Sequence, residues 1–575
     1  MIFLPSATCK CTPSHRVCDE FLSMRPAALD DREGCGAIRR LTEVRRAWPD
    51  GASRATYKDK SAQIWRLPIK LTNRTPNATS ISKRPSIRLR LENFRLFRDS
   101  GWFNLAPLTC LVGRNSSGKS SVLSAILLLK QSVEREAMGS ALMPLALSGT
   151  YCDLGNYVDV VHNHDESSEI SLSFSISVPD LKKASSDRSA PFVDFSVPRP
   201  RQFGYFYGYG PWSDTKLPER GQIEVRLSFS VDEPFGPSLS RFEIKVAEVG
   251  TASFVRTISG ERREHWRVYT TVLPPKSLRL RLGPRSFFPI IEARPAFYSR
   301  SAPTVKHRIS VFVAASRFFF LFLQQCLSRS EFIGPFRTPP ERRYAFGGFS
   351  STRGGPSGEQ AVDLLITELL LKPQGPRSLH SALSFWVRHL KLADSLDVKD
   401  IAKRLNLFEV DITGAGRGTT ANLADVGFGV SQVLPVLIQG LLTRSGGIYL
   451  VQQPEIHLHP DAQAGLADFF IYLASYGVIT VVETHSEYLL LRLRRRLAEG
   501  IRPLAAGSSV ERRDVLPLTT SDVAVLLTGS DDDEAEVKQL EIGDSFQFEN
   551  LPVDFMSQAL DDRVALLNAI GKRNG

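Results

Sequence analysis

The sequence predicts an α/β fold whose two halves are separated by a β-rich insertion and a helical segment. An apolar strand, a glycine-rich loop and an apolar helix follow one another between Leu108 and Leu129. Strand–helix alternation returns between Gly447 and Leu497. Between these segments, short runs of alternating apolar and polar residues are separated by Pro, Gly and Ser, which is typical of antiparallel strands.

The composition is that of a globular protein, with 42% hydrophobic and 23% charged residues. A chain of 575 residues is too long for one core, so several domains or lobes are expected. The net charge of +11 arises mostly near the N-terminus, where residues 1–100 hold 20 Lys/Arg against 10 Asp/Glu, compared with 52 against 51 elsewhere. The total charge is therefore no indication of a nucleic-acid groove in the body of the protein.

No membrane span is expected. The longest apolar run, Val311–Leu327, is interrupted by polar residues and is shorter than the roughly 20 residues that a spanning helix needs, so it predicts a core helix. The seven cysteines are scattered without a disulfide framework, and the N-terminus lacks the pattern of an export signal. We therefore expect a cytoplasmic protein that does not act on a membrane.

The expected segments follow in chain order. Residues 1–85 are basic and rich in turn formers, which predicts a disordered extension or a start codon assigned too far upstream. The remaining segments are an N-terminal half-domain at 86–150, a β-rich inserted lobe at 151–310, a helical segment at 311–420, a C-terminal half-domain at 421–500 and a small α+β extension at 501–575. Within the lobe we expect strands at Ile170–Val178, Ile223–Val231, Phe242–Val249 and Trp266–Leu273.

The loop Gly113–Ser120 reads G-x-x-x-x-G-K-S between the strand and the helix. Glycines let backbone N–H groups face phosphate oxygens, and the helix that follows presents its positive N-terminal end to the anion. Lys119 is expected to reach the β- and γ-phosphates, and the Ser120 hydroxyl to bind Mg²⁺. The loop predicts a site for ATP and Mg²⁺ formed by Gly113, Arg114, Asn115, Ser116, Ser117, Gly118, Lys119, Ser120 and Ser121.

Three further motifs accompany this loop. An apolar strand at Gly447–Val451 precedes Gln452-Gln-Pro-Glu455, and a second at Val478–Val482 precedes Glu483-Thr-His-Ser486. The glycine-rich turn Asp425–Gln432 opens an apolar helix. A helix start of this kind is a second potential anion site.

With the strings GRNSSGKSS, DVGFGVSQVLPVL, QQPEIHLHP and ETHSE in this order, the chain resembles bacterial AAA-type ATPases whose ABC-type head is related to RecF, SMC and OLD proteins. The resemblance spans roughly residues 87–530 and is weakest across the inserted lobe. It implies an ABC-type P-loop ATPase head, split by the β-rich lobe and helical segments, in which two subunits sandwich two ATP molecules. The expected partners are thus a second copy of the chain on ATP binding, and DNA or an effector protein in DNA maintenance or anti-phage defence.

The resemblance also assigns roles to individual residues. Gly427, Gly429 and Ser431 would contact the γ-phosphate held by the opposite subunit, and His485 would be the switch histidine that senses this phosphate. ABC-type heads carry an Asp that supports Mg²⁺ followed by a Glu that polarises the attacking water. These positions are here Gln452, on the metal side, and Gln453, at the catalytic position.

An amide cannot take up a proton and carries no charge, so hydrolysis is expected to be slow. It would otherwise depend on Glu455 or Glu483, the remaining nearby carboxylates. The sequence therefore leaves open whether the protein is an ATPase or an ATP-sensing scaffold with little or no hydrolysis. A P-loop kinase is a third, less favoured interpretation.

Other charged motifs have alternative readings. Arg492, Arg494, Arg495 and Arg496 lie on one helix and suit either a solvent face or a phosphate backbone. Arg337, Arg342 and Arg343 could contact nucleotide, nucleic acid or acidic groups of the lobe. His457-x-His459 is not expected to bind a metal, because no third ligand lies at useful spacing.

OLD-type proteins continue into a Toprim nuclease domain, for which residues 501–575 are too short. The acidic run Asp531–Glu534 is expected to be a hairpin loop.

Overall fold

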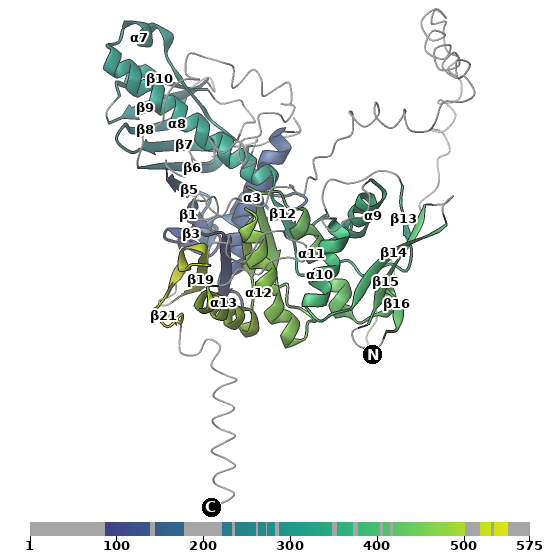
Figure 1. Cartoon of the computed structure of the whole chain (residues 1–575). Helices are drawn as coiled ribbons and strands as arrows, with labels where there is room; N and C mark the ends of the chain where they lie inside the picture. The colour runs from purple at the N-terminus through teal and green to yellow at the C-terminus, as the bar shows by residue number, and fades with distance from the viewer. Residues whose placement is uncertain are drawn as a thin grey trace, which may run out of the picture. The chain divides into compact units, whose positions relative to one another are not determined.

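A seven-stranded sheet brings the two halves of the sequence together (Figure 1). Its strand order is β12-β17-β18-β4-β19-β20-β21. The first five strands are parallel to their neighbours, and β20 and β21 are antiparallel. The strands are β12 (Glu331–Ile333), β17 (Ile448–Gln452), β18 (Ile479–Glu483), β4 (Leu108–Gly113), β19 (Val523–Ser530), β20 (Ala535–Ile542) and β21 (Phe548–Glu549). The predicted α/β class is confirmed. β4 from the N-terminal half-domain lies between β18 from the C-terminal half-domain and β19 from the expected C-terminal extension, so that extension contributes to the same sheet.

The structure is a computed structural model, and its described residues belong to one compact unit, Leu71–Gly575. The expected N-terminal extension, residues 1–85, lies outside them. The described ranges are 87–137, 144–177, 221–232, 236–259, 263–271, 273–281, 287–347, 354–371, 378–402, 406–414, 418–500, 518–530 and 534–549.

The parallel sheet separates two hydrophobic clusters because successive side chains of a strand point to opposite faces. In β4, Leu111 belongs to the first cluster, and Cys110 and Val112 belong to the second. In the same way β17 divides Leu450 from Tyr449. The first cluster includes α3 (Lys119–Ala137) and α8 (Pro303–Ser328). The second includes α9 (Ala361–Leu371), α10 (Leu379–His389), α11 (Phe428–Leu442), α12 (Pro460–Ser475) and α13 (Glu487–Glu499).

An antiparallel sheet in the order β2-β1-β5-β6-β7-β8-β9 forms most of the expected lobe, and β3 also pairs with β1. The sheet crosses the boundary expected at residue 150, because β1 pairs with β5 over six residues from Ile87↔Ile176 to Glu92↔Ser171. The strand β8 was not among those expected. The strands are β1 (Ile87–Phe94), β2 (Phe97–Asp99), β3 (Phe103–Leu105), β5 (Ile170–Ser177), β6 (Gln222–Asp232), β7 (Gly236–Val246), β8 (Gly250–Ser259) and β9 (Arg263–Thr270).

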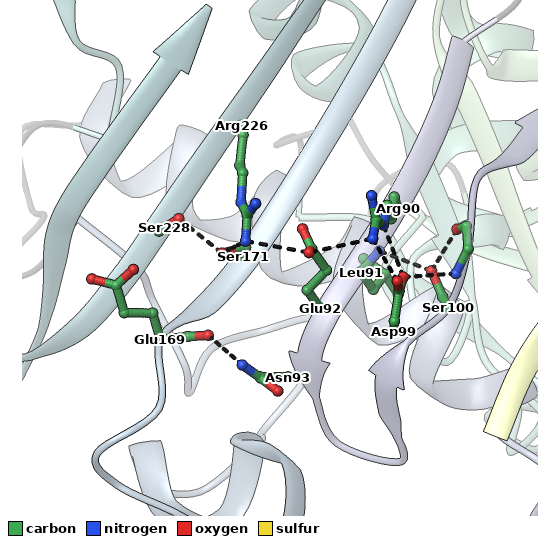
Figure 2. Close-up of polar contacts among 11 residues, drawn as sticks. Arg90, Leu91, Glu92, Asn93, Asp99, Ser100, Glu169, Ser171, Arg226 and Ser228 are labelled. Carbon is green, nitrogen blue, oxygen red and sulfur yellow. Dashed lines mark hydrogen bonds and ion pairs between the residues drawn. The ribbon is translucent and has the colours of Figure 1, made fainter. Parts of the chain in front are cut away.

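Ion pairs and hydrogen bonds link the strands on the polar face of this sheet (Figure 2). Arg90 Nε donates to Asp99 Oδ1 at 2.8 Å, and Glu92 lies 3.5 Å from Arg90 and 3.3 Å from Arg226. Arg226 also donates to Ser171 Oγ at 3.3 Å. These contacts join β2, β1, β5 and β6, and cross-strand pairs of this kind add modestly to sheet stability and register.

Helix α8 is long and apolar enough, by length and composition, to cross a membrane. However, 72% of its apolar 18-residue stretch is buried within the protein. Phe319 packs against Phe174 of β5 with ring centroids 6.1 Å apart. Phe320 lies 5.7 Å from Phe242 of β7 and 5.4 Å from Phe288. The antiparallel sheet thus covers this helix, as expected for a core helix.

The segment 311–420 contains strands as well as the expected helices. A four-stranded sheet contains β13 (Tyr344–Ala345), β14 (Ser395–Ala402), β15 (Leu407–Thr413) and β16 (Thr420–Asn422). In β15 every second residue, Phe408, Val410 and Ile412, is buried. This period of two is that of a strand, so the purely helical prediction for this segment is corrected.

The last elements are short strands and helices. The two-stranded sheet of β10 (Leu278–Arg281) and β11 (Ile290–Ala293) and the short helices α4 (Tyr157–Val160) and α7 (Pro295–Arg300) complete the lobe region. After the parallel strands, β19 and β20 form the expected hairpin, pairing as far as Ser530↔Ala535. Of the acidic run at the hairpin tip, 531–533 lie outside the described residues, and Glu534 pairs with Arg98 at 2.9 Å.

Candidate functional site

Three loops meet at the carboxyl ends of β4, β17 and β18. They are the glycine-rich loop after β4, the segment Gln452–Glu455 after β17, and Glu483–Ser486 at the end of β18. Backbone hydrogen bonds join them: Thr484 N donates to Leu111 O at 3.1 Å, and Gln453 N donates to Glu483 O at 2.8 Å. The carboxyl ends of parallel strands are where α/β folds bind their ligands.

The glycine-rich loop needs its two terminal glycines. Gly113 and Gly118 have φ angles of 147° and 104°. A Cβ atom on Gly113 would lie 2.4 Å from Thr528 O, and one on Gly118 would lie 2.8 Å from the Phe97 ring. A hydrogen bond of 2.6 Å between the Ser117 and Thr528 hydroxyls fixes the loop to β19. The loop therefore has a defined shape that a larger residue at either glycine would distort.

Lys119 begins α3 and its side chain lies back across the loop. Its Nζ donates to Gly113 O at 3.0 Å and to Arg114 O at 2.6 Å. Burial lowers the pKa of Lys119, while the nearby Glu483 carboxylate acts in the opposite direction. The ammonium is thus held by two carbonyl oxygens at the mouth of the loop, where an anion could replace them.

The remaining loop residues divide into exposed and buried ones. Ser121 is buried, and its N–H donates to Gly118 O at 3.0 Å. The exposed side chains are those of Arg114, Asn115, Ser116 and Ser120. Four of the nine residues of the predicted phosphate-binding segment are therefore exposed.

Glu483 lies at the centre of the site. The Ser120 hydroxyl donates to Glu483 Oε1 at 3.1 Å, and Gln452 Nε2 donates to Glu483 Oε2 at 2.9 Å. Gln452 and Glu483 are direct partners in the β17–β18 ladder. A buried carboxylate thus joins the serine of the glycine-rich loop to the residue on the predicted metal side.

The loop after β17 is held by a buried arginine. Arg337 Nη2 donates to Gln452 O at 2.9 Å and to Gln453 O at 3.1 Å. Gln453 itself has a φ of 43°, an uncommon conformation for a residue other than glycine. Arg337 therefore supports the site through the backbone, a contact that the sequence alone did not predict.

Glu455 and His485 are joined by one hydrogen bond, because the His485 N–H donates to Glu455 Oε1 at 2.6 Å. Burial raises the pKa of Glu455, and the hydrogen bond from His485 opposes this. Partial burial lowers the pKa of His485, and the positive charge of Lys119 lowers it further. The structure therefore places His485 within electrostatic range of the glycine-rich loop and gives Glu455 a role in holding its backbone.

The glycine-rich turn before α11 exposes an aromatic side chain. Phe428 is 66% exposed, whereas Ser431 is 4% exposed and donates to Phe428 O at 3.1 Å. A Cβ atom on Gly429 would lie 2.9 Å from His457 O, so this turn packs tightly on the loop after β17. The Ser431 hydroxyl thus points to its own helix here, and Gly427 and Phe428 form the exposed surface.

The arginines of α13 have partners within the protein. Arg492 and Arg496 pair with the buried Asp468 of α12 at 2.8 Å and 2.6 Å. Arg494 donates to Phe546 O at 2.7 Å, and Arg495 pairs with Glu499 at 2.7 Å. These contacts favour a structural role over a phosphate contact.

The arginines of the loop before α9 are also paired. Arg342 pairs with Asp425, and Arg343 pairs with Glu409 at 3.2 Å. Neither acidic residue belongs to the inserted lobe. The alternative that Arg342 and Arg343 contact acidic groups of the lobe is therefore wrong.

The histidines after β17 have structural surroundings. His459 caps the N-terminus of α12, and the His457 ring lies 6.0 Å from the Phe428 ring. Within the described ranges, the structure has no group of three or more His, Cys, Asp or Glu residues arranged to hold a metal ion.

Two segments of the chain match family models. Residues 87–183 match the model described as "AAA ATPase domain". Residues 360–492 match the model described as "AAA domain, putative AbiEii toxin, Type IV TA system". No curated protein matches the sequence.

Among solved structures, similar chains are heads of Smc proteins. One is described as the SmcHead bound to the C-winged helix domain of ScpA, with 11% identity, a TM-score of 0.34, and coverage of 79% of this chain and 98% of that chain. A second, the Smc head domain with an extended coiled coil bound to the C-terminal domain of ScpA derived from Pyrococcus furiosus, also has 11% identity and a TM-score of 0.34, with 84% and 99% coverage. The SMC head domain from Thermotoga maritima has 9% identity, a TM-score of 0.30, and 80% and 100% coverage.

The two family matches flank most of the inserted lobe and contain the three loops of the site. The first includes the glycine-rich loop, and the second includes Gln452–Glu455, His485 and the turn before α11. The two segments that are similar to AAA-type ATPase domains thus meet in the parallel sheet.

Proposed function

We propose that the protein binds ATP with Mg²⁺ at this site and acts as an ATP-dependent dimerising switch with slow hydrolysis. The observation that carries the proposal is the cluster of Lys119, Ser120 and Glu483 at the carboxyl ends of adjacent parallel strands. It combines an ammonium, a hydroxyl and a carboxylate beside a loop shaped by Gly113 and Gly118. These are the groups that phosphate and Mg²⁺ require in P-loop proteins.

The donor set suits this cofactor. Mg²⁺ prefers oxygen ligands and is bound in nucleotide sites by one or two carboxylate or hydroxyl groups together with substrate phosphates. Ser120 would hold the metal, and Lys119 and the backbone of Gly113–Ser121 would hold the phosphates. Mg²⁺ would supply positive charge for the phosphate oxygens.

The dimerising role is supported by the exposed turn before α11. Gly427 and Phe428 lie at the start of a helix of 15 residues, whose N-terminal end is attractive to an anion. In the proposed dimer this turn, with Gly429 and Ser431, meets the γ-phosphate bound by the other subunit. Contact by Ser431 would require its hydroxyl to leave Phe428 O and turn outward.

Phe428→Asp is expected to prevent dimerisation while leaving ATP binding to the monomer intact. The new carboxylate would lie on an exposed surface, where it does not disturb the core, but it would repel the phosphate of the facing subunit. Analytical ultracentrifugation with ATP and Mg²⁺ measures the mass, and isothermal titration calorimetry measures ATP affinity. Tyr269→Asp, at a 55% exposed position on β9, is the matched control. If Phe428→Asp still dimerises with ATP, the proposed interface is wrong.

Slow hydrolysis follows from Gln453, because an amide cannot accept the proton of an attacking water. Gln453→Glu is therefore expected to raise the steady-state rate of ATP hydrolysis by about 10²-fold, a typical contribution of a positioned base. Phosphate release is measured at saturating ATP, with Gln539→Glu, at an exposed position on β20, as a control for added charge. An unchanged rate with unchanged ATP affinity would favour the alternative function, an ATP-sensing scaffold that hydrolyses little or no ATP.

A role in DNA maintenance or anti-phage defence is the broader part of the proposal. The description of the model matching residues 360–492, with its putative toxin, supports a defence role. The partner would be DNA or an effector protein, and the protein would act in the cytoplasm without a membrane. Measuring ATP turnover and oligomeric state with and without duplex DNA tests this: a change in either supports a DNA partner, and no change in both favours a protein effector.

A further inference from the structure

We propose that Glu483 supplies the Mg²⁺-supporting carboxylate of this site from β18, in place of an acidic residue at the end of β17. This inference rests on the proposed function, because it assigns the metal side of the same ATP site. Strand β18 would thus provide the negative charge that the neutral Gln452 on β17 lacks.

The register of the sheet supports this exchange. Gln452 is the last residue of β17 and Glu483 the last of β18, and the two are direct partners in a parallel ladder. Side chains at paired positions of parallel strands project to the same face at the same level. A carboxylate on β18 can therefore reach almost the same place as one on β17.

The contacts of Glu483 point to the metal side of the loop. Its Oε1 accepts from Ser120 Oγ at 3.1 Å, and Ser120 is the residue whose hydroxyl binds Mg²⁺ in loops of this sequence. Its Oε2 accepts from Gln452 Nε2 at 2.9 Å, so the amide orients the carboxylate.

The other nearby carboxylate is engaged elsewhere. The Oε1 atom of Glu455 accepts the His485 N–H at 2.6 Å, and the side chain is buried. Pro454 and the positive φ of Gln453 turn the chain between β17 and Glu455, so Glu455 is not in strand register with Gln452. Its contact fixes the backbone of the histidine, whereas Glu483 contacts the P-loop serine.

The test compares ATP affinity with Mg²⁺ and with EDTA, measured by isothermal titration calorimetry on the full chain. In Glu483→Gln, the gain in affinity that Mg²⁺ provides should fall about 10-fold or more, the scale on which groups around a metal alter its affinity. Metal-free ATP should bind as well as before or more tightly, because a negative charge near the phosphates has been removed. A merely structural role would instead weaken binding under both conditions.

The double variant Gln452→Glu with Glu483→Gln should restore the Mg²⁺ effect. It exchanges the carboxylate and the amide between paired positions and keeps the hydrogen bond between them. Mn²⁺ electron paramagnetic resonance with ATP gives a second readout that does not depend on turnover.

The outcomes separate this inference from the proposed function. Retention of the full Mg²⁺ effect in Glu483→Gln, or its loss in Glu455→Gln instead, would overturn the assignment to Glu483 while leaving the ATP site in place. Absence of ATP binding by the unmodified chain would overturn the proposed function itself. Failure of the double variant to recover, with a native unfolding temperature, would show that the two positions are not equivalent and would also reject the proposal.

Discussion

Lys119→Ala is expected to weaken ATP binding by about 100-fold and to remove any hydrolysis. Hydrogen bonds to charged groups contribute about 1.5–3 kcal/mol each, and 2.7 kcal/mol corresponds to roughly a 100-fold change in Kd. The ammonium already lies at the mouth of the loop, bonded to Gly113 O and Arg114 O. It therefore needs only to exchange these carbonyl oxygens for phosphate oxygens.

Isothermal titration calorimetry with ATP and Mg²⁺ measures this loss. Lys391→Ala is a suitable control, because this lysine is 72% exposed and pairs with the exposed Asp461. The unfolding temperature distinguishes lost binding from lost folding. ATP affinity that is unchanged in a folded Lys119→Ala protein would contradict the proposed site.

Asp468→Ala is expected to lower the free energy of unfolding by about 3–5 kcal/mol, the usual cost of removing one partner of a buried ion pair. The carboxylate is fully buried and accepts hydrogen bonds from His389 of α10 and from Arg492 and Arg496 of α13. Its loss would remove the buried counter-ion of two partly buried guanidinium groups, of which Arg496 would keep only its ion pair with Glu499. Urea unfolding followed by circular dichroism measures the change.

Asp461→Ala, on the same helix, removes an exposed pair with Lys391 and should lower the stability much less than Asp468→Ala does. A similar small cost for Asp468→Ala would show that the buried network is not a source of stability.

The same network predicts a loss of stability in acid. Burial would by itself raise the pKa of Asp468, but the hydrogen bonds from His389 and Arg496 hold it well below its ordinary value. A carboxyl whose pKa is lower in the folded state stabilises the protein above its unfolded pKa of about 3.9. This contribution should therefore decline as the pH falls below about 4.

The sequence predicted the elements around the glycine-rich loop well, because motif, strand and helix are adjacent in the chain. The class of fold, the strand β4, the helix α8 and the hairpin of β19 and β20 all follow from local periodicity. The position of Glu483 beside Ser120 could not be predicted with the same ease. It depends on the register between β17, β18 and β4, which the periodicity of one strand does not determine.

The arginines of α13 show a second limit of prediction from sequence. Their basic pattern on α13 is the same whether they face solvent, a phosphate backbone or a buried acid. Asp468 lies on α12, and its sequence context gave no indication that it would be enclosed by Arg492 and Arg496.

A useful signal for Glu483 was nevertheless present: two buried strands end in polar residues, and only one of these, Glu483, carries a charge.

The placement of β4 between β18 and β19 has a consequence for biosynthesis. Leu111 pairs with Glu483, about 370 residues later in the chain, and β19 follows later still. At about 5–20 residues per second, translation leaves β4 without either neighbour for about 20–70 s. During that time its hydrophobic residues and both edges need protection from aggregation, so the nascent chain is expected to depend on chaperones. β4, the strand that leads into the proposed nucleotide site, is synthesised early but gains its neighbouring strands late.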